Sequence, residues 1–130
     1  SAPVLGRLLD KGRPLTGEME TIAKFNKAFP QYTREGAKLP TPGVSKSEAL
    51  AVGGMRWLHV SDDAIAYMRE TANERLLVAV TRNPVHALHI DAVAFGITSL
   101  EHAFGFEASL DGERVVITAP TAGGGIWRVS

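Results

Sequence analysis

Residues 53–83 read GGMRWLHVSDDAIAYMRETANERLLVAVTRN, and this stretch decides the fold. Its apolar residues fall into three short runs, which predict strands at about 55–60, 64–70 and 75–82. Two clusters of turn-forming residues separate the runs, Ser61-Asp62-Asp63 and Thr71-Ala72-Asn73-Glu74. Links this short leave no room for a parallel crossover, so we expect neighbouring strands to be antiparallel.

The strand pattern continues towards the C-terminus, with further strands predicted at about 85–91, 113–118 and 125–129. Asn83-Pro84 and Asp111-Gly112 supply turn residues, and Asp-Gly is the strongest hairpin signal. Residues 95–106 lack strict alternation, which predicts a mixture of strand and loop, and Gly123-Gly124-Gly125 predicts a loop before the last strand. We therefore expect a mainly β protein, an antiparallel β-sandwich with an N-terminal helical segment.

The N-terminal part has a helical period instead. Thr16 is a suitable N-cap, and apolar residues recur at three- and four-residue spacing, which predicts an amphipathic helix at about 17–28 that Pro30 ends. The stripe consists of Met19, Ile22, Phe25 and Phe29. Prolines and glycines over 30–47 predict an extended connection, and Ser45 or Ser47 is positioned to cap a short helix through Val52. The predicted division is a helical and linker segment, 1–52, and a β-sandwich domain, 53–130.

Composition limits the function. A chain of 130 residues is one domain and is too short for an eight-stranded α/β barrel of roughly 250 residues. Fourteen basic residues balance fourteen acidic ones, so we expect no nucleic-acid partner and no membrane partner. The absence of cysteine excludes disulfides and leaves the compartment open, with the cytoplasm slightly favoured. The chain begins Ser1-Ala2 without methionine, which fits a segment cut from a longer protein.

Few residues carry the pattern of a reactive site. The side chains of metal-ligand type are His86, His89, Asp91 and His102. In a strand, however, His86 and His89 point to opposite faces. We therefore expect these to be surface residues, and we expect no metal and no other cofactor. The carboxylates available for acid/base work are Asp62, Asp63, Glu101, Glu107, Asp111 and Glu113. The Asp62-Asp63 pair is typical of a turn. No catalytic residue is nominated, and a small hydrolase or metal enzyme is the weakest alternative.

Three aromatic residues, Trp57, Tyr67 and Trp127, are the candidate contacts with carbohydrate, because an exposed ring presents a flat apolar face to a sugar. Trp57 alternates in phase with Met55, and Trp127 with Val129, which favours rings that point into the core. Packing anchors are therefore the preferred interpretation. A free-standing carbohydrate-binding module that presents these rings to an α-glucan is the alternative.

Three strand runs carry a resemblance to a known family: Gly53 to Val60, Asp62 to Glu70, and Glu74 to Asn83. With the closing runs Val115 to Pro120 and Ile126 to Val129, they resemble the C-terminal β-domain of the alpha-amylase family of glycoside hydrolases, over about residues 45–130. The resemblance implies a parent enzyme that cleaves or transfers α-glucosidic bonds with three carboxylates of a catalytic barrel. Those motifs are absent from this chain, so it implies a non-catalytic domain.

The resemblance also implies partners. We expect the catalytic barrel of the parent enzyme to be the main one, with an α-glucan and a second copy in a homodimer as further candidates. A domain taken from its barrel would expose an apolar face larger than a monomer usually tolerates. We expect the amphipathic helix at 17–28 to cover that face, since its own apolar stripe needs a partner.

Overall fold

The computed structural model describes residues 16–30 and 54–130, and all that follows concerns these ranges. The described part of the chain is mainly β, with 57% of its residues in strands and 14% in a helix. The elements in chain order are α2 (Thr16–Ala28), β1 (Gly54–Val60), β2 (Ala64–Glu70), β3 (Arg75–Thr81), β4 (Val85–Asp91), β5 (Leu100–Gly105), β6 (Glu107–Asp111), β7 (Arg114–Ala119) and β8 (Gly123–Val129).

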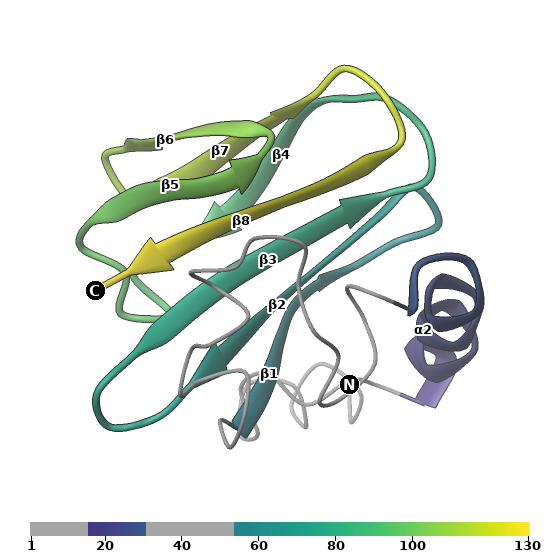
Figure 1. The fold of residues 1–130 in the computed structure, drawn as a ribbon, viewed down its shortest axis with the longest axis horizontal. Coiled ribbons are helices and arrows are strands. Elements are labelled where there is room, and N and C mark those ends of the chain that lie inside the picture. The colour runs from purple at the N-terminus through teal and green to yellow at the C-terminus, as the bar shows by residue number, and fades with distance from the viewer. Residues whose placement is uncertain (1–15, 31–53) are drawn as a thin grey trace, which may run out of the picture.

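The strands form two antiparallel sheets that pack as a sandwich (Figure 1). One sheet has five strands in the order β1-β2-β3-β8-β5, and the other has three in the order β4-β7-β6. Strands β1, β2 and β3 pair as consecutive antiparallel neighbours, as their short links require. The last strand, β8, lies between β3 and β5 inside the larger sheet. The predicted fold class is confirmed.

Most element boundaries agree with the sequence. Strands β2 and β4 have the predicted bounds, β1 and β3 differ from theirs by one residue at one end, and β7 differs by one residue at each end. Residues 95–106 contain a loop followed by β5, in agreement with the predicted mixture of strand and loop, whereas β6 was not predicted. Both β5 and β6 are edge strands, and the register of β5 with β8 shifts between His102 and Phe104. The sequence of this region therefore lacks the regular alternation that predicts a strand.

The predicted glycine loop before the last strand is wrong, because β8 begins at Gly123 and contains all three glycines. A Cβ atom on Gly125 would clash with the indole of Trp127, two residues along on the same face. Gly105, on the neighbouring strand, has φ of 73° and a Cβ there would clash with the carbonyl oxygen of Gly124. These glycines are strand residues whose side-chain space is taken by other atoms.

Helix α2 runs from Thr16 to Ala28, which confirms the predicted helix. The Phe29 amide donates to the Phe25 carbonyl at 2.7 Å beyond the last helical residue. The connection and the short helix predicted between residues 31 and 53 lie outside the described residues. Within the described ranges, no helix has the length and apolar character needed to cross a membrane.

Two apolar clusters lie on the two faces of the five-stranded sheet. The inner core fills the space between the sheets and consists of Ala64, Ala66, Met68, Leu77, Ala79, Leu88, Ile90, Ala92, Ile97, Val115, Ile117, Trp127 and Val129. The outer core lies on the opposite face and consists of Ile22, Phe25, Trp57, Ile65, Tyr67, Leu76, Val78, Val80 and Ile126. The five-stranded sheet is therefore a middle layer.

Candidate functional site

The outer face of the five-stranded sheet is the candidate functional surface, because it is an apolar sheet face that a second layer covers. Strands β1, β2, β3 and β8 each contribute residues to its outer core. Helix α2 adds Ile22 and Phe25, and Figure 1 shows the helix beside the end of these strands. The expected docking of α2 on the sheet is confirmed, since both residues belong to the same buried cluster as Trp57.

Aromatic contacts fix α2 at this position. The Phe25 ring is fully buried, and its centroid lies 6.3 Å from that of Phe29. The Arg82 guanidinium lies over the Phe25 ring at 5.7 Å from its centroid, within cation–π range. The i, i+4 spacing of the two phenylalanines brings their rings to one side of the helix, so both face the sheet.

The outer core also contains a buried hydroxyl and borders a buried charge. The Tyr67 ring packs on Trp57 with centroids 5.3 Å apart. Burial raises the pKa of the Tyr67 hydroxyl above its usual range, although the nearby Arg69 guanidinium acts in the opposite direction. Arg69 itself is buried on β2. The face is thus apolar in its centre, with the Arg69 guanidinium beside it.

All three aromatic residues proposed as sugar contacts are buried. The exposed fractions are 8% for Trp57, 1% for Tyr67 and none for Trp127. Trp57 and Tyr67 belong to the outer core, whereas Trp127 belongs to the inner core. Alternation within one strand could not reveal that the two tryptophans face opposite layers. Burial supports the packing interpretation, and a contact with carbohydrate stays a prediction.

The histidines and aspartate considered for a metal do not converge. His86, His89 and Asp91 are exposed on β4, whereas His102 is exposed on β5 of the other sheet. A register shift between Val85 and Leu88 interrupts the simple alternation expected for His86 and His89. Within the described ranges, no group of three or more potential ligands could hold a metal ion.

These residues have local contacts instead. His89 Nδ1 lies 3.3 Å from Arg114 Nη1. The Asp91 carboxylate accepts a hydrogen bond of 3.0 Å from the Ala94 amide, and His102 Nε2 lies 2.9 Å from the Gly105 carbonyl oxygen. Each contact is with a neighbour or cross-strand partner, so these side chains have structural roles in turns and strand edges.

The Asp62-Asp63 pair forms the turn between β1 and β2, as predicted. Ser61 caps the turn, since its hydroxyl accepts from the Ala64 amide at 3.2 Å. Asp63 joins this turn to the β3–β4 turn, because its carboxylate accepts a hydrogen bond of 2.9 Å from the Asn83 side-chain amide. The remaining carboxylates considered for catalysis, Glu101, Glu107, Asp111 and Glu113, are all exposed.

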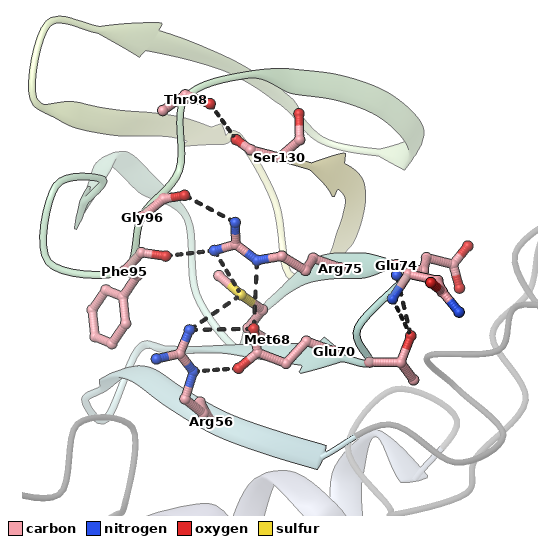
Figure 2. Close-up of polar contacts among 11 residues, drawn as sticks. Arg56, Met68, Glu70, Glu74, Arg75, Phe95, Gly96, Thr98 and Ser130 are labelled. Atoms are coloured by element: carbon pink, nitrogen blue, oxygen red, sulfur yellow. Dashed lines mark hydrogen bonds and ion pairs between the residues drawn. The ribbon is translucent and has the colours of Figure 1, made fainter.

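Sequence reasoning missed a charged cluster formed by Arg56, Glu70 and Arg75, shown in Figure 2. Glu70 pairs with Arg56 at 2.5 Å and with Arg75 at 3.4 Å, measured from carboxylate oxygen to Nε. The Arg75 Nη atoms donate to the carbonyls of Phe95 and Gly96, at 2.5 and 2.9 Å. Arg75 thereby fastens the β4–β5 connection to the larger sheet. Partners 20 or 21 residues away leave no local sequence signal.

Comparison with known proteins finds likeness in structure only. No protein-family profile matches the chain, and no curated protein matches it. Among solved structures, it is similar to AmyP, solved in complex with maltotriose, with a TM-score of 0.59, 10% identity, 66% of this chain covered and 18% of that chain.

Two further structures show the same likeness. The alpha-amylase from H. orenii gives a TM-score of 0.51 at 12% identity, and the Nostoc punctiforme debranching enzyme gives 0.53 at 16% identity. In both, 65% of this chain is matched to 18% of the enzyme. The solved structures it resembles are alpha-amylase-family glycoside hydrolases. The chain spans less than a fifth of their length, and identities this low show a shared fold alone.

Proposed function

We propose that this chain is a non-catalytic C-terminal β-sandwich domain of an alpha-amylase-family glycosidase, which packs on a catalytic barrel and stabilises it. In this proposal residues 53–130 form the domain, and residues 1–52 form a helical and linker segment before it. The fold shared with a fraction of several such enzymes supports the proposal.

The observation that carries the proposal is the apolar outer face of the five-stranded sheet. An isolated sandwich needs only the faces between its sheets to be apolar, with the other faces polar. Here the outer face bears Leu76, Val78 and Ile126, which are fully buried. An apolar face of this kind needs a covering layer, because exposing it to water is unfavourable. Because α2 packs on this face, in the parent enzyme the barrel would pack against the partly buried rim of the face, formed by Val60, Ala103 and Phe104.

A binding experiment tests the docking role. The chain is mixed with the catalytic barrel of an alpha-amylase-family enzyme from the same source, produced without its own C-terminal domain. We expect association in size-exclusion chromatography and a higher melting temperature for the barrel, because ligand binding to the folded state stabilises it. A barrel that neither associates nor gains stability at excess domain would contradict the proposal.

Two arginine substitutions identify the face involved. Ala103 on β5 borders the outer core, whereas Ser109 on β6 is exposed on the three-stranded sheet. We expect Ala103→Arg to weaken association, since a charge would be buried in an apolar contact. Ser109→Arg should leave it unchanged. Equal loss in both variants would point to a different surface.

A further inference from the structure

Strand β6 is an edge of the three-stranded sheet (Figure 1). The edges of the two sheets, in the part of the chain that the structure describes, are β1, β4, β5 and β6. The registers of β1, β4 and β5 with their neighbours each contain a shift, and such irregularities protect an edge from pairing with another chain. The register of β6 with β7 contains no shift. Among these edges, β6 is therefore the one regular enough to accept a further strand.

The backbone of β6 presents hydrogen-bonding groups to this edge. Asp111 and Arg114 flank a two-residue turn, so their backbones form a hydrogen-bonded pair. Alternation along an antiparallel ladder then directs the N–H and C=O groups of Ala108 and Leu110 away from β7. Within the described ranges, no backbone hydrogen bond outside the helix and the sheets involves either residue. An extended partner can therefore pair with both.

Charges on β6 decide which partner suits it. Glu107 and Asp111 are exposed, and neither carboxylate has a hydrogen bond or ion pair with the residues that the structure describes. Asp111 lies opposite Arg114, whereas Glu107 lies opposite Thr118, which carries no charge. A second copy of β6, aligned antiparallel over its full length, would place Glu107 opposite Asp111 twice, and like charges directly opposite each other are destabilising. A strand with basic residues four positions apart has the complementary charges.

An apolar pocket at the first residue of β6 provides a place for a side chain of the partner. Its volume is about 270 Å³, and it is lined by Gly105, Phe106, Glu107, Thr118 and Pro120. This volume lies below the usual range of small-ligand sites, roughly 300–1,000 Å³, and suits one long side chain. The aliphatic part of a lysine or arginine can pack on apolar surface while its charge stays in water. Phe106 and Pro120 supply that surface, and Glu107 supplies the opposite charge.

We propose that β6 binds an extended basic segment of a partner protein by strand addition, with one lysine or arginine of that segment in the pocket beside Glu107. The backbone of the segment pairs with Ala108 and Leu110. A second basic side chain, four positions away on the same face of the added strand, lies opposite Asp111. Main-chain hydrogen bonds supply the affinity, and the two acidic residues supply the preference for a basic sequence.

The test is an NMR titration of the full chain with the peptide Thr-Lys-Val-Thr-Val-Lys-Thr, blocked at both ends. We expect saturable shifts of the Ala108 and Leu110 amides and slower exchange of both with solvent, because their N–H groups become hydrogen-bonded. A peptide with glutamate in place of both lysines should bind about tenfold more weakly, since its charges are reversed. A peptide with proline in place of the second valine should also lose about tenfold, since it lacks a backbone donor.

A substitution in the chain tests the pocket. Glu107→Gln should weaken binding of the lysine peptide about fivefold, the upper end for an exposed ion pair. The matched control is Glu20→Gln, which removes an exposed carboxylate of α2 and should leave the Kd unchanged. Equal affinity of the Glu107→Gln variant and the unsubstituted chain would overturn the proposal.

Three other results would also overturn it: shifts that do not saturate, exchange at Ala108 and Leu110 that the peptide does not slow, or equal binding of the three peptides. Protection of the two amides that rises with protein concentration, without peptide, would assign the edge to a second copy instead. The titration uses no barrel, and the docking experiment uses no peptide. The failure of either proposal therefore leaves the other standing.

Discussion

The two sheets of the sandwich differ in how many of their faces are buried. In β2 and β3 of the five-stranded sheet, six of the seven residues are buried without alternation. In β6 and β7 of the three-stranded sheet, residues that are buried or partly buried alternate with residues that are more exposed. The first pattern is typical of a strand covered on both faces, and the second of a strand with one face in water. A small β domain can thus contain a middle layer, which is covered here by the three-stranded sheet on one face and by α2 on the other.

The inner core should show the largest effect. Trp127 is fully buried between the sheets, and its indole lies against Gly125. We expect Trp127→Ala to lower the free energy of unfolding by roughly 3–5 kcal/mol, because it removes a large side chain and leaves a cavity. Urea denaturation measures this. Ser109→Ala, on the open face, should stay within about 0.5 kcal/mol, and similar losses in both variants would break the comparison between the sheets.

The outer core should be nearly as sensitive to substitution as the inner core, because α2 covers it. We expect Phe25→Ala to cost about 3 kcal/mol, the low end for a buried phenylalanine, and to promote self-association measured by sedimentation velocity. Met19→Ala is the control, because Met19 is 54% exposed on the same helix. An unchanged melting temperature and a monomeric Phe25→Ala variant would mean that the helix stabilises nothing.

The Arg75 contacts should matter less than either core. We expect Arg75→Met to cost about 2 kcal/mol, since hydrogen bonds from a charged group to two carbonyls are lost. Amide exchange at Ile97 should accelerate, because the β4–β5 connection would no longer be fastened. The matched control is Arg114→Met on the three-stranded sheet, where exposure should limit the effect to about 0.5 kcal/mol. Unaltered exchange would show that packing alone holds the connection.

Tyr67 gives the smallest effect at neutral pH and a distinct one in alkali. Burial raises the pKa of its hydroxyl in the folded state above the unfolded value of about 10. The neutral phenol therefore stabilises the fold fully below about pH 10, and this contribution is lost as the pH rises further. We expect Tyr67→Phe to lose less stability between about pH 9 and pH 11 than the unsubstituted chain. Parallel losses in urea melts would mean that the hydroxyl is hydrated.

Sequence patterns predicted the central strands because their residues combine β-branched or aliphatic runs with short polar turns. The runs around Leu76 and Ile65 are apolar on both faces, so the pattern predicts a strand even where its expected boundary is one residue off. The edge strands β5 and β6 were harder. In β5, Glu101 and His102 are both exposed, and Gly105 adds no apolar side chain to the pattern. The hydrophobic alternation on which strand prediction depends is therefore weak.

The candidate surfaces were only partly predictable. The apolar stripe around Ile22 and Phe25 predicted that α2 would need a partner, and the outer core provides it. The charged cluster of Arg56, Glu70 and Arg75 could not be predicted, because its members come from three different strands that only the folded sheet brings together. The three glycines of β8 predict a loop because sequence does not reveal that the Phe106 ring lies against Gly123 and the Trp127 ring against Gly125.

The strand order has a consequence for synthesis of the protein on the ribosome. Strand β8 joins β3 to β5 within the larger sheet, yet it follows both of them in the chain. While residues 123–129 remain in the exit tunnel, β3 keeps an unpaired edge and β5 has no partner in its sheet. During this interval the nascent chain is vulnerable to chaperone capture or aggregation. A ribosome that stalls before residue 123 would release a chain whose larger sheet lacks the strand between β3 and β5.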